Sequence, residues 1–436
     1  MTPTPGLLEV DVLVIGAGMA GAMAALAARD AGATVAVASR APGATALSSG
    51  AVGVAPDPTA SPDEPLAWLR APVEAARRLA ARRPDHPYAA VGVAGLWRLG
   101  EALRFAARQL EPLLAPPLER PRLLATPAGN AVRAALCQRS MDAGDLLAVR
   151  GPLLVCGFAG HLAFDAALVA AGLARYTPRG GPEVGDAEVA LPFDDPAARP
   201  HELARALEPP GAAERLGEAL RIPAGALGAG AILLPPVLGL DPAARVPERI
   251  AAAAGMPVAE TLSDVPSVPG LRLHAALEAR LRVAGVARVT GEAAGAPAPG
   301  RAVEIGGTVV RAETWILASG RFVGGGIARR GALVEPALGL PVQAAEGREA
   351  GVHLARRPAA SLTVRDRRAP QPLLSAGLRV DAALRPVDDR GRPVHPRLLA
   401  AGAVIGGHEQ ATDGSGLGVA ILTGFLAGRA AARRGA

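Results

Sequence analysis

Lysine is absent from this sequence, and all 46 of its basic residues are arginine. The net charge is only +6 over 436 residues, because 40 acidic residues are interspersed with the arginines and no long run of one sign occurs. Aromatic residues make up 3% of the chain, which leaves few platforms for stacking bases. The sequence therefore predicts no nucleic-acid partner.

Cysteine is nearly as scarce as lysine. Cys137 and Cys156 are the two in the chain, and they are too far apart for a C-x-x-C pair and have no histidine at metal-site spacing. We therefore expect neither an iron–sulfur cluster nor a structural zinc ion, and no metal-binding residues are predicted.

Long apolar runs are also missing. The most apolar internal stretch, residues 225–240, contains Pro235 and Pro236 and is shorter than the roughly 20 residues that a membrane helix needs. The N-terminal residues show neither the basic flank nor the cleavage pattern of a secretory signal. These features predict a cytoplasmic protein.

Half of the residues are apolar, which is enough for a large core and for two or three domains. The clearest pattern lies at the start. Residues 10–15 predict a strand buried on both faces, the alanine-rich segment 20–31 predicts a helix, and residues 34–38 predict a second strand. This order is one complete strand–helix–strand unit.

A glycine-rich turn, G-A-G-M-A-G, joins the first strand to the helix. In such turns the first glycine, here Gly16, permits the tight bend, and Gly18 lets backbone amides approach a pyrophosphate. Gly21 allows the helix to pack closely on the strand, and the helix N-terminus then faces the anion. Because the flanking elements are those that the motif requires, the turn predicts nucleotide binding.

The acidic residue that usually ends the second strand is missing, since Ser39 and Arg40 occupy that place. An arginine there suits the 2′-phosphate of NADP, or it is a solvated loop cation. The following loop, residues 44–51, is small and rich in hydroxyl groups. It either passes beneath a bulky ring or diphosphate, or it is an ordinary surface turn.

The patterns farther along the chain predict an α/β protein with a Rossmann-like FAD/NAD(P)-binding domain assembled from its N- and C-terminal segments. Residues 314–318 read as a buried strand ending at Ser319-Gly320, and residues 398–403 as a second strand-to-glycine turn before an apolar helix at 419–432. Alternating strands and helices in the middle predict an inserted α/β cap domain. The expected division is 1–95, 96–291 and 292–436.

Several stretches carry a family resemblance. The GxGxxG turn, "ILASG" and "LLAAGAVIGG" resemble flavoproteins of the fumarate reductase and succinate dehydrogenase type. More narrowly, "ATALSSGAV", "PSVPGLRL", "ILASGRFVGGGIARRGALVEPALGLPV" and "LRVDAALRP" are similar to the B-subunit family of anaerobic glycerol-3-phosphate dehydrogenase. The resemblance extends from about residue 10 to about residue 430.

This resemblance implies a flavin, FMN or FAD, and a complex that oxidises sn-glycerol 3-phosphate to dihydroxyacetone phosphate. Electrons would pass toward quinone, with a catalytic flavoprotein partner and a membrane-anchoring iron–sulfur subunit, so that the complex sits at the periphery of the inner membrane. The cofactor contacts expected from the motif and the resemblance are Gly16, Gly18, Gly21, Ser39, Arg40, Ser48, Ser49, Gly50, Gly320, Gly402, Gly406 and Gly407.

Two positions depart from relatives that use FAD, which commonly have an acidic residue where Ser39 and Ala403 stand here. Both departures fit a shorter flavin or a looser site. For the substrate phosphate, Arg321, Arg272 and Arg385 are candidates because arginine binds phosphate in a bidentate manner. His408 is the candidate general base, since it lies beside the Gly406-Gly407 turn.

Three functions stay open at this stage. The first is a flavin subunit of a glycerol-3-phosphate dehydrogenase. The second is a stand-alone flavoprotein of the fumarate reductase type. The third is a non-catalytic subunit whose flavin relays electrons or supports assembly.

Overall fold

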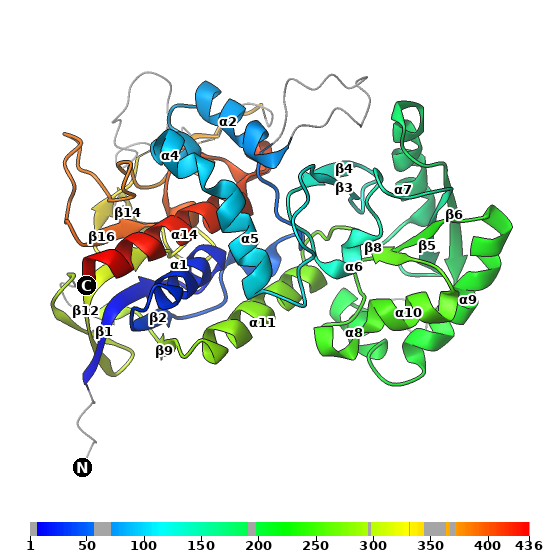
Figure 1. Cartoon of the computed structure of the whole chain (residues 1–436), viewed down its shortest axis with the longest axis horizontal. Coiled ribbons are helices and arrows are strands. Elements are labelled where there is room, and N and C mark those ends of the chain that lie inside the picture. Colours follow the sequence, from blue (N-terminus) through cyan, green and yellow to red (C-terminus); the bar gives the residue numbers. More distant parts are fainter. Residues whose placement is uncertain are drawn as a thin grey trace, which may run out of the picture.

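The computed structural model describes residues 7–55, 71–190, 198–294, 298–330, 332–343, 363–366 and 371–435. Its largest sheet has seven strands in the order β10-β11-β12-β1-β2-β9, with β16 also paired to β12. The strands are β1 (Leu7–Ile15), β2 (Val35–Ser39), β9 (Ala287–Thr290), β10 (Ala293–Ala294), β11 (Ala302–Ile305), β12 (Thr308–Leu317) and β16 (Leu398–Ala400). Strands β1, β2, β9, β12 and β16 run parallel, so both ends of the chain share one sheet (Figure 1).

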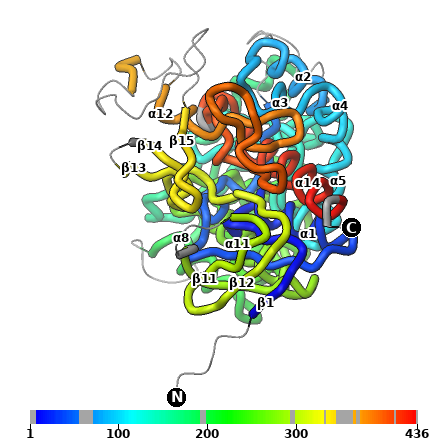
Figure 2. Tube along the Cα trace, turned by 90° about the vertical axis from the view of Figure 1, so that its left-hand side faces the viewer, coloured from blue at the N-terminus to red at the C-terminus, as the bar shows by residue number. Residues whose placement is uncertain are grey.

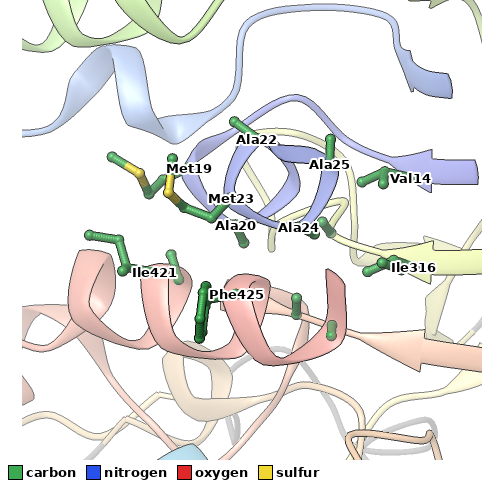
Figure 3. Close-up of a cluster of buried hydrophobic side chains, with 14 of the residues drawn as sticks. Val14, Met19, Ala20, Ala22, Met23, Ala24, Ala25, Ile316, Ile421 and Phe425 are labelled. Atoms are coloured by element: carbon green, nitrogen blue, oxygen red, sulfur yellow. The ribbon is translucent and has the colours of Figure 1, made fainter. Parts of the chain in front are cut away.

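Helices α1 (Met19–Asp30) and α14 (Gly416–Gly435) pack against each other and against β1 and β12. All side chains of α1 from Met19 to Ala28 are buried, as expected of a helix that is apolar on every side. Figure 3 shows Met19 and Met23 of α1 facing Ile421 and Phe425 of α14. The predicted α/β fold and its terminal pairing are thereby confirmed.

A second sheet of four parallel strands has the order β6-β5-β7-β8 and lies at the right of Figure 1. Helix α7 packs on one face, whereas α8, α9 and α10 form a separate core on the other. The elements are β5 (Leu153–Phe158), α7 (Ala166–Leu173), β6 (Val184–Val189), α8 (Pro200–Ala206), α9 (Ala212–Leu227), β7 (Ala231–Leu234), α10 (Val246–Ala254) and β8 (Val258–Glu260). This is the inserted α/β unit.

Some elements inside the predicted segment 96–291 pack with the large sheet instead. Helix α5 (Leu99–Gln109) contacts α14, α11 (Val268–Val283) contacts α1, and β9 pairs with β2. The second sheet thus lies between Leu153 and Glu260, well inside the predicted segment. The division at residues 95 and 291 stays a prediction.

The remaining elements are short. They are α2 (Pro72–Arg82), α3 (Pro87–Ala90), α4 (Gly92–Trp97), β3 (Arg122–Ala125), β4 (Ala131–Ala134), α6 (Arg139–Asp142), β13 (Ala328–Arg330), β14 (Ala332–Glu335), β15 (Leu340–Pro341), α12 (Pro372–Ser375) and α13 (Gln410–Asp413). Strands β13 to β15 form a small sheet, which Figure 2 shows on the left, opposite α14 and the C-terminus.

Among the described residues, no helix is long and apolar enough to cross a membrane. In the same residues no three His, Cys, Asp or Glu side chains are grouped so that they could hold a metal ion. Cys137 and Cys156 are buried free thiols, and burial raises the pKa of each to about 12. Neither thiol is therefore reactive at neutral pH.

The contact between α1 and α14 gives a test of stability. A Cβ atom on Gly424 would lie 2.3 Å from the carbonyl oxygen of Ala20, so we expect Gly424→Ala to lower the free energy of unfolding by about 1–3 kcal/mol despite the better helix propensity of alanine. Gly225 in α9 has open space around it, and Gly225→Ala should instead be neutral or stabilising. Urea denaturation measures both. Equal effects of the two substitutions would contradict the close packing.

Candidate functional site

A cavity of about 760 Å³ opens at the carboxyl-terminal edge of the parallel strands. Its lining includes residues at or just beyond the ends of β1, β2, β9 and β12, together with the first turns of α1 and α14. In open α/β sheets this edge is where ligands bind. Its lining contains Gly16, Gly18, Ser39, Arg40, Ser48, Gly320, Arg321 and His408.

The glycine turn is as tight as the sequence predicts. Gly16 has a φ of +110°, and a Cβ atom there would lie 2.2 Å from the carbonyl oxygen of Ala318. A Cβ atom on Gly21 would lie 1.8 Å from the carbonyl oxygen of Gly16. Gly18 is the N-cap residue of α1 and offers no side-chain cap, so the first turn of the helix presents backbone amides to the cavity.

The hydroxyl-rich loop after β2 contacts this turn. Thr45 Oγ1 accepts a hydrogen bond from the Met19 amide at 2.9 Å, and Ser48 Oγ donates to the Thr45 carbonyl at 2.7 Å. Ser49 and Gly50 instead contact residues that follow β8. The Ser49 carbonyl accepts a hydrogen bond from the Ser263 amide, and a Cβ atom on Gly50 would collide with Pro269. The loop therefore touches both the cavity and the segment that follows β8.

Arg321 follows the Ser319-Gly320 turn and is held by backbone carbonyls. Its guanidinium donates to the carbonyl oxygens of Ala403 at 3.2 Å, His408 at 3.1 Å, Ile405 at 3.4 Å and Leu374. Burial lowers its pKa to about 10, so the group keeps its charge at neutral pH. Arg321 thus fixes the 403–408 loop at the rim of the cavity, and its role toward a substrate stays a prediction.

His408 lines the cavity with a buried ring whose Nδ1 atom has no hydrogen-bond partner among the residues that the structure describes. Burial, followed by the positive charge of Arg321, lowers the pKa of His408 well below its usual value. The ring is therefore neutral at physiological pH. Ser319 Oγ, also in the lining, is a second buried polar atom for which the described part of the chain offers no partner.

A cluster of polar side chains, most of them buried, lies beside the His408 ring. The His86 ring lies edge-on to it, with 5.8 Å between centroids, and His86 Nε2 is 3.2 Å from Ser415 Oγ. Asp413 lies 4.0 Å from the same nitrogen and forms an ion pair with Arg83 at 3.1 Å. Burial, with a smaller contribution from Arg83, lowers the pKa of His86 to about 3.

The glycines of the last loop serve close packing. The Gly402 amide donates to Thr423 Oγ1, and a Cβ atom at this position would lie 2.5 Å from the Ala20 Cβ. A Cβ on Gly407, whose φ is +86°, would meet the Asp85 carbonyl at 1.8 Å, and Gly406 packs on Gly377. Within the described cavity lining only Ala403 and His408–Glu409 represent this loop.

Two other candidate arginines are paired elsewhere. Arg385 forms an ion pair with Asp381 at 2.6 Å, and Arg272 forms a buried ion pair with Glu260 between α11 and the end of β8. Neither belongs to the described lining of the cavity. That these two arginines bind the substrate phosphate stays a prediction, and neither contacts the described cavity.

Four charged residues of the lining were not named in the sequence analysis: Glu292, Arg330, Glu335 and Glu409. The Glu335 carboxylate is buried and accepts backbone hydrogen bonds from Ala337 and Leu338, and burial raises its pKa. Arg330 lies within the family-like block from residue 316 to residue 342, which is the one signal that pointed to it. Glu292 follows a strand that the sequence analysis assigned to the inserted domain.

Comparisons with known proteins identify an FAD-binding family and a set of related subunits. The family model described as "FAD binding domain" matches residues 11–419. A Halobacterium salinarum protein, named as the probable B subunit of an anaerobic glycerol-3-phosphate dehydrogenase, is 34% identical over 98% of both chains. A Pectobacterium carotovorum protein, named as the B subunit of the same kind of enzyme, is 30% identical over 95% of this chain and 97% of its own.

Among solved structures, a 3-ketosteroid delta1-dehydrogenase from Sterolibacterium denitrificans aligns with 98% of this chain and 100% of its own, at 14% identity and a TM-score of 0.44. An E. coli quinol fumarate reductase aligns with 98% of this chain and 71% of its own, at 11% identity and a TM-score of 0.41.

The buried histidines predict acid lability. An unfolded histidine titrates near 6.5, whereas His86 stays neutral down to about pH 3 in the folded chain. Below pH 6.5 unfolding therefore takes up a proton here, and the free energy of unfolding falls as pH falls, by up to about 1.4 kcal/mol per pH unit for each such histidine.

We expect His86→Gln to reduce this slope between pH 6 and pH 4, and His201→Gln, in α8 of the inserted unit, to leave it unchanged. Urea denaturation at several pH values measures the slope. An unchanged slope in His86→Gln would contradict the assignment of the proton uptake to this ring.

Proposed function

Because the chain belongs to the FAD-binding domain family, and within it to the B subunits of anaerobic glycerol-3-phosphate dehydrogenase, we propose that it is the flavin subunit of a complex that oxidises sn-glycerol 3-phosphate to dihydroxyacetone phosphate. The observation that carries the proposal is the similarity to those subunits over almost the whole of both chains. Electrons then leave toward quinone through partner subunits, one a flavoprotein and one an iron–sulfur protein at the membrane.

Of the two flavins expected, the family identifies FAD, and the cavity suits it. One cavity is lined by Ser39, by the Gly16 turn and the start of α1, and by His408. Its volume of about 760 Å³ is in the range of cofactor sites. The unpartnered Ser319 Oγ and His408 Nδ1 atoms are available to a ligand.

The proposed division of roles follows from the lining. When bound, FAD supplies hydride acceptance, the redox chemistry that side chains lack. The Gly16 amide donates to the Ala38 carbonyl and the Met19 amide to Thr45 Oγ1, so the amides of Ala17, Gly18 and Ala20 are the ones that hold the diphosphate. His408, whose carbonyl is held by Arg321, takes the hydroxyl proton of the substrate at a ring nitrogen, because burial keeps the ring neutral and one of its nitrogens free of a proton.

Arg330 is the group we propose for the substrate phosphate. It lines the cavity, and within the described residues its charge acts on the buried Glu335 carboxylate without a direct ion pair, whereas Arg321 is committed to carbonyl oxygens and Arg385 to Asp381. Its guanidinium is therefore available to bind a phosphate through two parallel hydrogen bonds. The neighbouring Arg329 on the same strand is outside the described lining and serves as a matched control.

We expect Arg330→Ala to raise KM for sn-glycerol 3-phosphate at least about ten-fold, as one lost charge-assisted contact would, while Arg329→Ala changes KM less than about two-fold. Steady-state kinetics of the purified complex with an artificial acceptor measures both. Equal KM values for the two variants would remove Arg330 from the substrate site.

An anaerobic titration separates this function from its alternatives. The flavin absorbance of the purified chain, and of the complex captured through a tag on it, is followed during addition of sn-glycerol 3-phosphate or succinate. Bleaching of the isolated chain by sn-glycerol 3-phosphate supports the proposal. Bleaching by succinate alone points to a stand-alone fumarate reductase-type flavoprotein. Bleaching that requires the partner subunits, with none in the isolated chain, points to a relay or assembly subunit.

A further inference from the structure

The end of β2 lacks an acidic residue, but the neighbouring strand brings one to the same place. Strand β9 pairs with β2 in parallel, with Thr290 opposite Ser39, and the Gly291 amide donates to the Ser39 carbonyl at 3.2 Å. Because parallel strands end at the same edge of a sheet, Glu292 emerges two residues beyond Thr290 beside the end of β2. It lines the cavity together with Gly291, Ser39 and Arg40.

The carboxylate of Glu292 is available to a ligand. In the structure it forms an ion pair with Arg40, and the two side chains are 62% and 50% exposed, respectively. Exposed ion pairs of this kind contribute little stability, so a ligand hydroxyl competes with the arginine for the carboxylate oxygens at small cost. A second arginine nearby, Arg288, is occupied by Glu278 at 3.0 Å and by Ser39 Oγ at 3.1 Å.

We propose that Glu292 binds the adenosine ribose of FAD, in place of the carboxylate that dinucleotide-binding folds usually carry at the end of β2. That carboxylate accepts hydrogen bonds from the ribose hydroxyls, and it sits where the second strand ends, one turn from the pyrophosphate site. Glu292 reaches the same edge from β9, so the recognition chemistry is kept while its position in the sequence moves by more than 250 residues.

The same pairing disfavours NADP. Arg40 is the residue that suits a 2′-phosphate, but its charge is balanced by Glu292 and its guanidinium lies against the Gly324–Gly325 loop, with 3.5 Å from Nη2 to the Gly324 carbonyl. A phosphate at the 2′ position would meet the Glu292 carboxylate, which repels it. Glu292 therefore selects an adenosine with a free ribose diol.

The test is flavin binding by the apoprotein of Glu292→Gln, which keeps the size of the side chain and removes its charge. We expect FAD affinity, measured by quenching of flavin fluorescence, to fall roughly ten-fold, equal to about 1.4 kcal/mol. FMN affinity should not change, because FMN has no adenosine. The matched control is Glu9→Gln, since Glu9 is 63% exposed and paired with Arg311 at the opposite edge of the same sheet.

A competition experiment tests the same site with nucleotides that lack the flavin ring. Adenosine 2′,5′-diphosphate and 5′-ADP compete with FAD, and we expect Glu292→Gln to shift the preference toward the 2′-phosphorylated nucleotide by freeing Arg40. Glu292→Ala repeats the measurement without an amide at the position, and melting temperatures confirm that each variant is folded.

Two results would overturn the proposal. One is an FAD affinity of Glu292→Gln and Glu292→Ala equal to that of the Glu9→Gln control. The other is a loss that is the same for FAD and FMN, which would indicate a general change of the cavity. The inference rests on FAD binding alone and is independent of the substrate, so the anaerobic titration with sn-glycerol 3-phosphate and this experiment fail separately.

Discussion

The close approach of the Gly16 turn to the Ala318 carbonyl holds the cofactor site together. Only 2.2 Å would separate that oxygen from a Cβ atom on residue 16, so a side chain cannot enter without parting β1 from β12. These strands come from opposite ends of the chain and are in register over their whole contact, with Val14 opposite Ile316. The glycine turn, which we propose to hold a diphosphate, therefore takes this shape only when β12 has paired with β1.

The packing of α14 extends the same constraint. Gly424 and Gly428 admit the carbonyl oxygens of Ala20 and Ala24, and this contact fixes the first turn of α1, which points into the cavity. The loop before α14 carries His408 and is tied to the Ser319-Gly320 turn by the carbonyl contacts of Arg321. The positions of Ser39 and His408 in the cavity lining are thus both set by the packing of the N-terminal and C-terminal segments in one core.

The local elements of this core were predictable from sequence because their signals are local. The apolar run of β1, the glycine spacing and the alanine-rich α1 each follow from neighbouring residues, and the strand ending at Ser319-Gly320 was visible for the same reason. The placement of α11 and β9 was not visible, because it depends on which sheet a short strand joins. The pairing of β9 with β2 brings Glu292 beside Ser39. The local motif alone shows only that the usual acidic residue is missing from the end of β2.

The glycines of the last loop and the arginines illustrate a second limit. Gly402 and Gly407 were assigned to the cofactor from the family resemblance, and in the structure they allow close backbone contacts beside the cavity. Arg321, Arg272 and Arg385 look alike in the sequence, yet their partners are backbone carbonyls, Glu260 and Asp381, respectively. The carbonyl partners of Arg321 lie more than 50 residues away in the sequence, and no spacing rule identifies them. Asp381 is only four residues from Arg385, so this pair alone could be suggested from spacing.

The most direct test of the account is the visible absorption spectrum of the purified chain, followed by release of the bound chromophore and its identification by mass. The assembled site predicts a flavin spectrum and released FAD. Released FMN would contradict the use of the Ser39 end of the cavity. A colourless protein that binds NADPH would contradict the flavin site altogether and would return Arg40 to a role in binding the 2′-phosphate.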